Sequence, residues 1–444
     1  MRDLYQKARP LLSLPHWRGR LLLWSAAAGV GGAAVAFARL ADTAQATLRH
    51  VLAHSALWPW LLSPLGLALI AWLTRRFFRG AEGSGIPQTI FALRTADEAQ
   101  GNEILSLRVL AGRVSLAAAA LLCGASIGRE GPTVQVGAAI THAVARFVPH
   151  GDMRALRRML IMAGGAAGVA AAFNTPLAGV VFAIEELSRS FEERASGTTL
   201  TAVVLAGVTA IALVGNYAYF GHPHLQSGLS TLSLTVFTVA LAGGLAGGLF
   251  SRLTLACVRG LPGTLGRIQR THPVWFALGC GATLAAIGWL SGGRTYGTGY
   301  LEARQILEQN AQLPWSYAPA RAVATLLSYL SGVPAGLLAP SLSVGAGLGQ
   351  VCGDLLGEGS LAYPAVLGMC AYLAGVTQAP MTTFVIVMEM TAGQQVVLPL
   401  MLTATIATGT SKLLSPALYR ALADRYGGGG QSKEVHRAAP RSPP

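Results

Sequence analysis

Long stretches without a charged side chain constrain the fold of this chain more than any other feature of its sequence. Of its 444 residues, 52% are hydrophobic and only 12% are charged, whereas about 25% of the residues in a soluble domain are charged. Each uncharged stretch is long enough to cross a bilayer as a helix. The sequence therefore predicts an all-α polytopic membrane protein. The stretches lie at 21–38, 57–74, 159–184, 228–251, 273–293 and 359–388.

The remaining charges are distributed as in a membrane protein and not as in a nucleic-acid-binding protein. The formal net charge is +14, and basic residues gather at the ends of apolar stretches, which is the pattern of cytoplasmic loops. The basic segment 1–20 precedes the first apolar stretch and is expected in the cytoplasm. The five cysteines form no C-x-x-C pair, so they indicate neither a metal site nor a disulfide framework. The basic clusters are Arg75, Arg76 and Arg79; Arg252, Arg259, Arg267 and Arg270; and Lys412, Arg420 and Arg425.

The sequence also repeats itself. "GREGPTVQVGAAI" at 128–140 aligns with "GLLAPSLSVGAGL" at 336–348, and "GSG" at 83–85 aligns with "GTG" at 297–299. A third match pairs "FNTPLAGVVFAIEEL" with "TQAPMTTFVIVMEMT", so that Pro176 corresponds to Pro380 and Glu185 corresponds to Glu389. Because the three matches occur in the same order, they indicate an internal duplication.

Charge predicts that the two halves are inverted. The first helix leaves the cytoplasm, whereas the loop 219–230 between the halves has no Lys or Arg and is expected outside. The second half therefore starts on the opposite side, and inverted repeats with Gly- and Pro-interrupted helices are typical of transporters. The expected organisation is a first repeat at 21–218, a second repeat at 231–414, a terminal helix at 415–426 and a disordered cytoplasmic tail at 427–444.

Four segments place Gly or Pro where a helix is expected to begin inside the membrane. Proline fits the first helical turn, and glycine leaves the backbone N–H groups accessible. Accessible N–H groups and the helix dipole together make an anion site. The alternative is that Gly and Pro only kink the helices and help them pack. The segments are "GSGIP" at 83–87, "GREGP" at 128–132, "GLLAP" at 336–340 and "SPALY" at 415–419.

With these motifs in order, the chain resembles the CLC family of chloride channels and chloride/proton antiporters over about residues 20 to 425. The resemblance implies tilted and partly re-entrant helices in two inverted repeats, and a homodimer with one pathway in each subunit. It implies that the hydroxyls of Ser84 and Tyr419 bind a central chloride with the backbone N–H groups of Leu337 and Leu338. The family pattern has an aromatic residue where Leu338 stands, so the resemblance does not predict the width of the pore at this point. The family often has lysine where Arg113 stands, and the arginine keeps the positive charge.

By the same resemblance, Glu130 is the external gating glutamate and Glu186 the internal proton-transfer glutamate. A deprotonated Glu130 can occupy an anion position and block the path, and protonation releases it. The alternative for Glu130 is an ion pair with Arg129. The alternative for Glu186 is a solvated helix end. Glu185 corresponds to Glu389, which suggests a structural role, whereas Glu186 corresponds to Met390 and is unique to the first half.

The sequence therefore predicts an antiporter that exchanges chloride for protons across a bacterial inner membrane, with both termini cytoplasmic. Its expected partners are chloride, protons, lipid and a second copy of the chain, with no nucleic acid, no metal and no cofactor. A passive voltage- or pH-gated chloride channel on the same fold is the alternative. A carrier of fluoride or another anion is disfavoured by "GSGIP" and Pro132. A hydrolase suggested by "GASIG" at 124–128, and a zinc site at His50 and His54, lack the further residues that they need.

Overall fold

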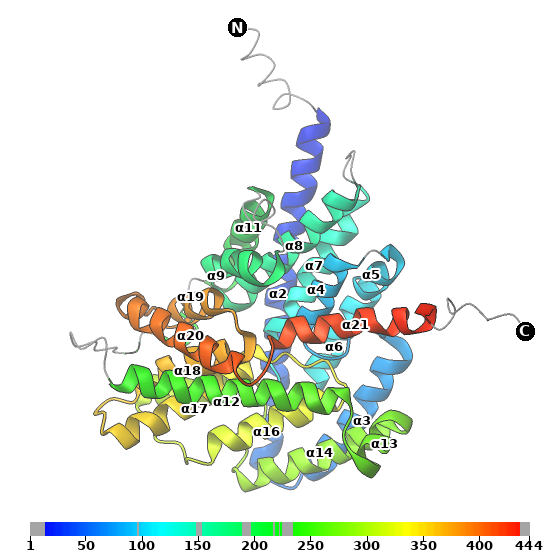
Figure 1. The fold of residues 1–444 in the computed structure, drawn as a ribbon. Coiled ribbons are helices and arrows are strands. Elements are labelled where there is room, and N and C mark those ends of the chain that lie inside the picture. Colours follow the sequence, from blue (N-terminus) through cyan, green and yellow to red (C-terminus); the bar gives the residue numbers. More distant parts are fainter. Residues whose placement is uncertain are drawn as a thin grey trace, which may run out of the picture.

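The computed structural model describes residues 14–95, 97–147, 153–188, 197–215, 218–221, 223 and 234–435, with the side chains of 14–16, 18 and 427–435 left out. Within this part of the chain, helices and the loops between them account for the structure, which confirms the predicted all-α fold. Figure 1 shows helices that cross one another at many angles, with α2 running through the molecule. The helices of the first half are α2 (Leu14–His54), α3 (Pro59–Phe77), α4 (Ile86–Arg94), α5 (Glu98–Ile104), α6 (Leu107–Leu122), α7 (Glu130–Ala145), α8 (Met153–Phe173), α9 (Pro176–Phe182), the π-helix η2 (Ala183–Leu187) and α11 (Gly197–Val214).

The second half is built in the same way and ends in an additional helix. Its helices are α12 (Leu234–Arg259), α13 (Gly263–Thr271), α14 (Pro273–Leu290), α15 (Tyr300–Gln309), α16 (Tyr317–Leu330), α17 (Leu338–Leu356), α18 (Ala362–Thr377), α19 (Pro380–Met390), the short 3₁₀ helix η3 (Gln394–Val396), α20 (Val397–Lys412) and α21 (Leu418–Val435). Helix α21 begins inside the predicted terminal segment 415–426 and continues into the predicted tail 427–444. Most of the predicted loop 219–230, residues 1–13 and residues 436–444 lie outside the described residues.

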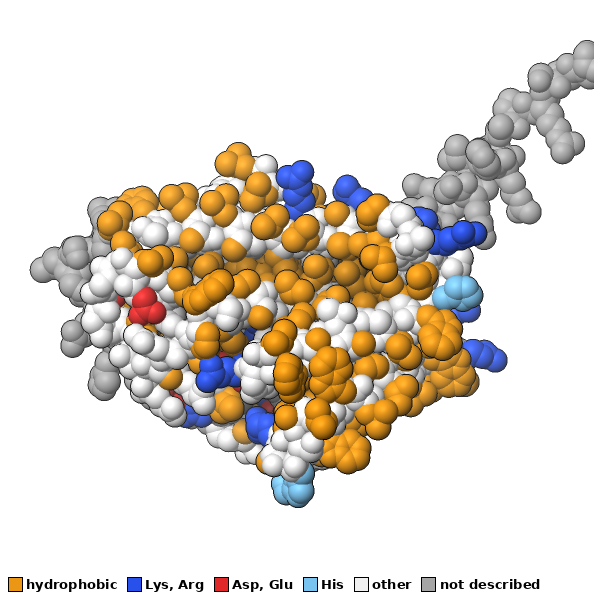
Figure 2. Space-filling view, turned by 90° about the horizontal axis from the view of Figure 1, so that it is seen from below, with side chains coloured by type: hydrophobic (Ala, Val, Ile, Leu, Met, Phe, Trp, Pro, Cys, Tyr) orange, Lys and Arg blue, Asp and Glu red, His pale blue; other side chains and the backbone are white. Residues whose placement is uncertain are grey.

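The helices have the length and the surface that a bilayer requires. Six helical segments in the described part are long and apolar enough to cross a membrane. On α12, Leu241, Leu245, Leu249 and Leu253 are each 45–50% exposed, and residues four apart lie on one face of a helix. Figure 2 shows hydrophobic side chains spread over one face of the molecule, with few acidic ones among them. Such a surface is expected to face the hydrocarbon of a bilayer.

Two of the uncharged stretches do not form single helices, contrary to the expectation from their length. The stretch 159–184 is divided between α8 and α9, and the stretch 359–388 is divided between α18 and α19. Asn174 and Gln378 have left-handed backbones at these breaks, with φ of 56° and 57°. Each break is followed two residues later by Pro176 or Pro380. Because proline restricts the residue before it and cannot continue the hydrogen-bonding pattern of the preceding helix, both stretches break at equivalent points.

Corresponding helices of the two halves pack in corresponding ways, which confirms the internal duplication. In the first half α7 packs on α8, and both α2 and α8 pack on α11. In the second half α17 packs on α18, and both α12 and α18 pack on α20. The arrangement follows from small residues. Gly137 on α7 and Gly164 on α8 face each other so closely that a Cβ atom on Gly164 would lie 2.3 Å from the carbonyl oxygen of Gly137.

A pair of carboxylates joins the halves reciprocally. Glu185 accepts hydrogen bonds from the N–H groups of Met381 and Thr382 at the start of α19, at 3.1 and 2.7 Å. Glu389 accepts from the N–H groups of Leu177 and Ala178 at the start of α9, at 3.3 and 2.7 Å. Each carboxylate therefore caps a helix of the opposite half, where the helix dipole favours a negative charge. The predicted structural role that Glu185 and Glu389 share is confirmed.

Substitution Glu389→Gln should weaken this junction. The amide keeps one acceptor oxygen but loses the charge and the second acceptor. We expect the free energy of unfolding to fall by about 1 kcal/mol. In detergent the thermal midpoint should then fall by roughly 2 °C.

The matched control is Glu308→Gln, which removes a carboxylate from an i,i+4 pair with Arg304 on α15. Such surface pairs contribute about 0.5 kcal/mol or less. Equal thermal midpoints for the two variants would contradict the capping role of Glu389.

Candidate functional site

The loop that carries Ser84 is fixed by a buried arginine. Arg113 on α6 is fully buried and donates from Nη1 to the carbonyl of Gly83 at 2.8 Å and from Nη2 to the carbonyls of Gly80 and Glu82. A guanidinium group has five donors in a fixed geometry, so one side chain can satisfy several carbonyls of a tight loop. Arg321 on α16 does the same for the "GTG" loop, donating to Gly297 at 2.6 Å. Arg113 therefore does more than keep a positive charge where the family often has lysine, because it also binds the carbonyls of the loop that carries Ser84.

Loops from both halves are bonded to each other at the centre of the molecule. Gly128 and Gly336 exchange two backbone hydrogen bonds, at 2.7 and 3.2 Å, in an antiparallel bridge. Gly83 donates to the carbonyl of Val333 at 3.1 Å, and Gly297 donates to the carbonyl of Ala125 at 3.2 Å. These paired contacts bring the starts of α4, α7 and α17 together, as the motifs predict.

Glycine is required where these loops meet. Gly85 has a φ of +94°, and a Cβ atom there would lie 2.6 Å from the carbonyl oxygen of Gly131. On Gly131 itself, a Cβ atom would lie 2.8 Å from the Ser84 hydroxyl oxygen. The backbone at the start of α7 therefore approaches Ser84 directly, with no side chain between them.

The predicted anion-binding groups are buried and lack partners. Ser84 is 0% exposed and Tyr419 is 1% exposed, and neither hydroxyl oxygen has a hydrogen-bond partner among the described residues. The N–H groups of Leu337 and Leu338, at the start of α17, have no acceptor within the described chain. Buried polar groups are nearly always satisfied. Several unsatisfied groups in one region therefore indicate a place for a ligand that accepts hydrogen bonds.

Glu130 is the first residue of α7 and is fully buried. Its Oε1 atom accepts a hydrogen bond of 2.6 Å from the Tyr300 hydroxyl. Its Oε2 atom has no hydrogen-bond partner in the described part of the chain and lies beside the start of α17, where a Cβ atom on Gly128 would be 2.3 Å from Oε2 and 3.2 Å from the N–H nitrogen of Ala339. The carboxylate therefore sits among the N-terminal amides of two helices, where an anion is favoured.

Arg129 does not serve mainly as the ion partner of Glu130. Its Nη1 atom donates to Asp42 at 2.8 Å and to the carbonyl of Ala38 at 2.7 Å, both on α2. Its Nε atom is 4.0 Å from Glu130 Oε1, which is the limit of an ion pair. Arg129 thus anchors the loop before α7 to α2, and the ion-pair alternative for Glu130 is at most a secondary contact.

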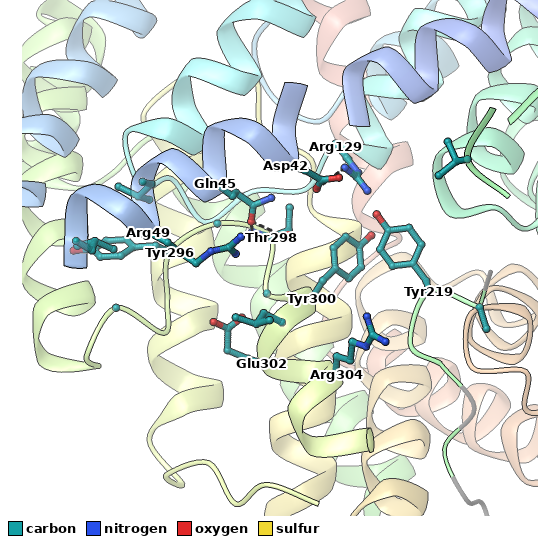
Figure 3. A pocket seen from close by; sticks show the side chains of 18 residues that line it. Asp42, Gln45, Arg49, Arg129, Tyr219, Tyr296, Thr298, Tyr300, Glu302 and Arg304 are labelled. Carbon is teal, nitrogen blue, oxygen red and sulfur yellow. Dashed lines mark hydrogen bonds and ion pairs between the residues drawn. The ribbon is translucent and has the colours of Figure 1, made fainter. Parts of the chain in front are cut away.

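Glu130 lies next to an open vestibule. A cavity of about 610 Å³ is lined by residues of α2, of the "GTG" loop and of α15, and Tyr300 and Arg129 form part of its wall. Figure 3 shows Tyr219, Tyr300, Arg129 and Asp42 gathered at one end of this cavity. The sequence analysis missed Tyr300 and Asp42. The repeat offers a signal for Tyr300, which directly follows "GTG" where Ile86 follows "GSG".

Glu186 lies close to Tyr419 and Leu338, two residues of the candidate anion site. It is 4% exposed, in the π-helix η2, so it is not a solvated helix end. Glu186, Tyr419 and Leu338 line one small cavity, together with Phe182 and residues of α18 and α19. The Oε1 atom of Glu186 has no partner among the described residues. Isolated π-helical turns are frequent at functional sites, and this one turns Glu185 and Glu186 toward different surroundings.

The two alternative motifs do not form sites. The Ser126 hydroxyl shares a hydrogen bond of 2.9 Å with Thr325, and its N–H group donates to Ser328. A helix, α6, precedes "GASIG", whereas a nucleophile elbow follows a strand. His54 contacts the carbonyl of His50 through Nδ1. Among the described residues, no group of three or more His, Cys, Asp and Glu side chains is placed to hold a metal ion.

Comparison with known proteins gives matches over most of the chain. The family model described as voltage gated chloride channel matches residues 66–412. An H(+)/Cl(-) exchange transporter named ClcA, from Cronobacter sakazakii, is 32% identical and covers 94% of this chain and 92% of its own length. A putative chloride channel protein, ClcB-like, from Ralstonia nicotianae is 31% identical and covers 82% of this chain and 86% of its own length.

Solved structures share the fold at lower sequence identity. A slow cyanobacterial Cl⁻/H⁺ antiporter has a TM-score of 0.77 at 24% identity and covers 93% of this chain and 99% of its own. A CLC-type fluoride/proton antiporter has a TM-score of 0.75 at 23% identity and covers 90% of this chain and 96% of its own. Together with the inverted repeats and the helix starts that meet at Ser84, Glu130 and Tyr419, these matches show that the chain belongs to the voltage-gated chloride channel family, the CLC family.

Proposed function

We propose that this protein exchanges chloride for protons across a bacterial inner membrane. The observation that carries the proposal is a pair of buried carboxylates, Glu130 and Glu186, near two buried hydroxyls. Among the described residues, one oxygen of each carboxylate and both hydroxyls have no hydrogen-bond partner. An anion and a proton can both use such a site. The similarity to an H(+)/Cl(-) exchange transporter supports the same activity.

The anion is bound by partial charges in this proposal. The hydroxyls of Ser84 and Tyr419 donate to a chloride, and the N–H groups of Leu337 and Leu338 complete its shell. All four residues are buried, so chloride enters without most of its water. Hydroxyl and amide dipoles hold an anion less tightly than a lysine or arginine would, which allows release as well as binding. The position of Leu338 on the cavity wall makes its side chain the local determinant of pore width.

Glu130 gates this path. Its carboxylate is deprotonated when it lies among the amides of α7 and α17, where it takes the place of an anion. Protonation removes the charge that favours this position, and the side chain then moves away and admits chloride. A proton from the vestibule is thereby carried to the edge of the anion site each time the gate opens.

Glu186 connects the gate to the cytoplasm. It lines the same small cavity as Tyr419 and Leu338, and a buried ionisable group inside a membrane protein is a candidate for a proton path. The corresponding position of the second half is Met390, which cannot carry a proton. Loss of Glu186 should therefore leave a path for chloride without a path for protons.

The second candidate function is a passive chloride channel, which the similarity to a putative chloride channel protein favours. Both functions use the same anion site and the same gate. In either case we expect a homodimer with one pathway in each subunit, as the resemblance to the CLC family implies.

Bromide soaked into crystals should occupy the anion site. We expect anomalous density between the hydroxyl oxygens of Ser84 and Tyr419, next to the first turn of α17. The double variant Ser84→Ala, Tyr419→Phe should lose this density and keep the fold. Density that appears only in the vestibule would contradict the site.

Substitution Glu130→Gln should imitate the protonated gate. Chloride flux in vesicles should stay within about tenfold of the wild-type rate, which is a change in barrier of about 1.4 kcal/mol or less. The pH dependence of that flux should largely disappear, and a chloride gradient should no longer move protons. A variant that remained fully coupled would show that Glu130 is not the gate.

Substitution Glu186→Gln should separate the two ions. Proton uptake driven by a chloride gradient should fall below detection, while chloride flux should stay within about tenfold of wild type. Glu389→Gln is the control, because it alters a carboxylate of the second half that caps a helix and should keep coupling. If the wild-type reversal potential follows the chloride gradient alone and ignores the pH gradient, the protein is a channel.

A further inference from the structure

The only described side chain that donates a hydrogen bond to the Glu130 carboxylate is Tyr300. Its hydroxyl lies 2.6 Å from Oε1, while its ring forms part of the vestibule wall. Tyr300 is the first residue of α15 and directly follows the "GTG" loop. Arg321 donates to the carbonyl of Gly297 in this loop and to the carbonyl of Arg294 before it. The hydroxyl therefore lies between the open vestibule and the buried Glu130 carboxylate, at the end of a loop that Arg321 holds in place.

The ring of Tyr300 is held by other aromatic side chains. Its centroid is 4.5 Å from that of Tyr219 and 5.5 Å from that of Phe220. The Arg129 guanidinium lies 5.6 Å from the Tyr219 ring centroid, and the N–H group of Phe220 donates to the carbonyl of Met390 at 2.9 Å. Figure 3 shows the rings of Tyr219 and Tyr300 next to each other, with Arg129 and Asp42 beyond them. Such packing restricts the direction in which the Tyr300 hydroxyl can donate.

The internal repeat supports a role for the hydroxyl itself. Ile86 stands at the position of the first half that corresponds to Tyr300, so an apolar side chain satisfies the same loop-to-helix geometry. The fold therefore does not need a hydroxyl at this point. In the first half, no gating carboxylate faces the corresponding position, because the residue that corresponds to Glu130 is Leu338.

We propose that Tyr300 is a positioning residue that holds the deprotonated Glu130 carboxylate in the closed gate and thereby sets the pH at which the pathway opens. This inference rests on the proposed function, since it assumes that Glu130 is the gate. The groups that face the carboxylate are Arg129 from its own loop, Tyr300 from α15, Tyr419 from α21 and the N–H groups of Glu130 and of Ala339 on α17. Asp42 on α2 acts through Arg129, to which it is bonded.

The direction of the effect follows from the donor. A hydrogen bond from Tyr300 stabilises the charged carboxylate more than the protonated one. Without this hydrogen bond, the Glu130 carboxylate takes up a proton at a higher pH. The charged carboxylate also competes less well with chloride for the position at the helix starts. Chloride flux, which rises as the pH falls, should then reach half of its maximum at a higher pH.

The test is Tyr300→Phe in reconstituted vesicles, which keeps the ring and its packing. We expect the pH of half-maximal chloride flux to rise by about one unit, as loss of one charge-assisted hydrogen bond predicts. The chloride concentration that half-saturates the flux should fall. Replacement of Tyr300 by 3-fluorotyrosine, a stronger donor, should shift the pH profile in the opposite direction.

Two controls make the result specific. Tyr219→Phe removes a hydroxyl from the same aromatic cluster and should leave the pH profile in place. In the Glu130→Gln background, Tyr300→Phe should cause no further change, because the charged acceptor is gone. If Glu130→Gln uncouples the ions but the profile of Tyr300→Phe overlays that of wild type, the positioning role is wrong and the proposed function stands. If the Glu130→Gln variant still couples chloride movement to proton movement, the proposed function itself is wrong.

Discussion

Every other feature of this molecule depends on how it satisfies backbone groups at helix ends that lie deep inside the protein. Hydrocarbon offers no hydrogen bonds, so an irregular segment at membrane depth must be satisfied by the protein itself. Here two buried arginines, Arg113 and Arg321, bind the carbonyls of the "GSG" and "GTG" loops. Reciprocal bonds between Gly128 and Gly336 join the segments before α7 and α17. These carbonyls are thus satisfied, and the N–H groups at the helix starts remain available to the proposed anion site.

The internal symmetry separates residues that serve the fold from residues to which we assign a role in transport. Glu185 and Glu389 occur in both halves and make the same contact in both. Glu186 corresponds to Met390, Glu130 corresponds to Leu338, and Tyr300 corresponds to Ile86. The ionisable groups of the proposed pathway thus break the symmetry of a duplicated scaffold. At these three positions, where the two halves differ, a substitution should change transport without changing stability.

The sequence predicts much of this architecture because its strongest signals are local. Uncharged stretches indicate apolar helices, and Gly-Pro motifs indicate where helices begin. Length alone misjudged the stretches 159–184 and 359–388, because the residues before Pro176 and Pro380 end one helix and start another. Ser84, Glu130 and Tyr419 could be named from motifs. The repeat singles out the position of Tyr300 but not its partner, and no motif singles out Asp42. Their contacts join segments far apart in the sequence, and such pairings depend on the folded arrangement of α2, α7 and α15.

The crossed carboxylate caps have a consequence for how the chain is made. Synthesis proceeds from the N-terminus, so α9 is complete long before Glu389 leaves the ribosome. Until then the N–H groups of Leu177 and Ala178 have no carboxylate to bind. The same delay applies to Glu185, whose acceptor oxygens wait for the start of α19. Neither half can therefore complete these hydrogen bonds alone, so both caps form only after α19 has been made.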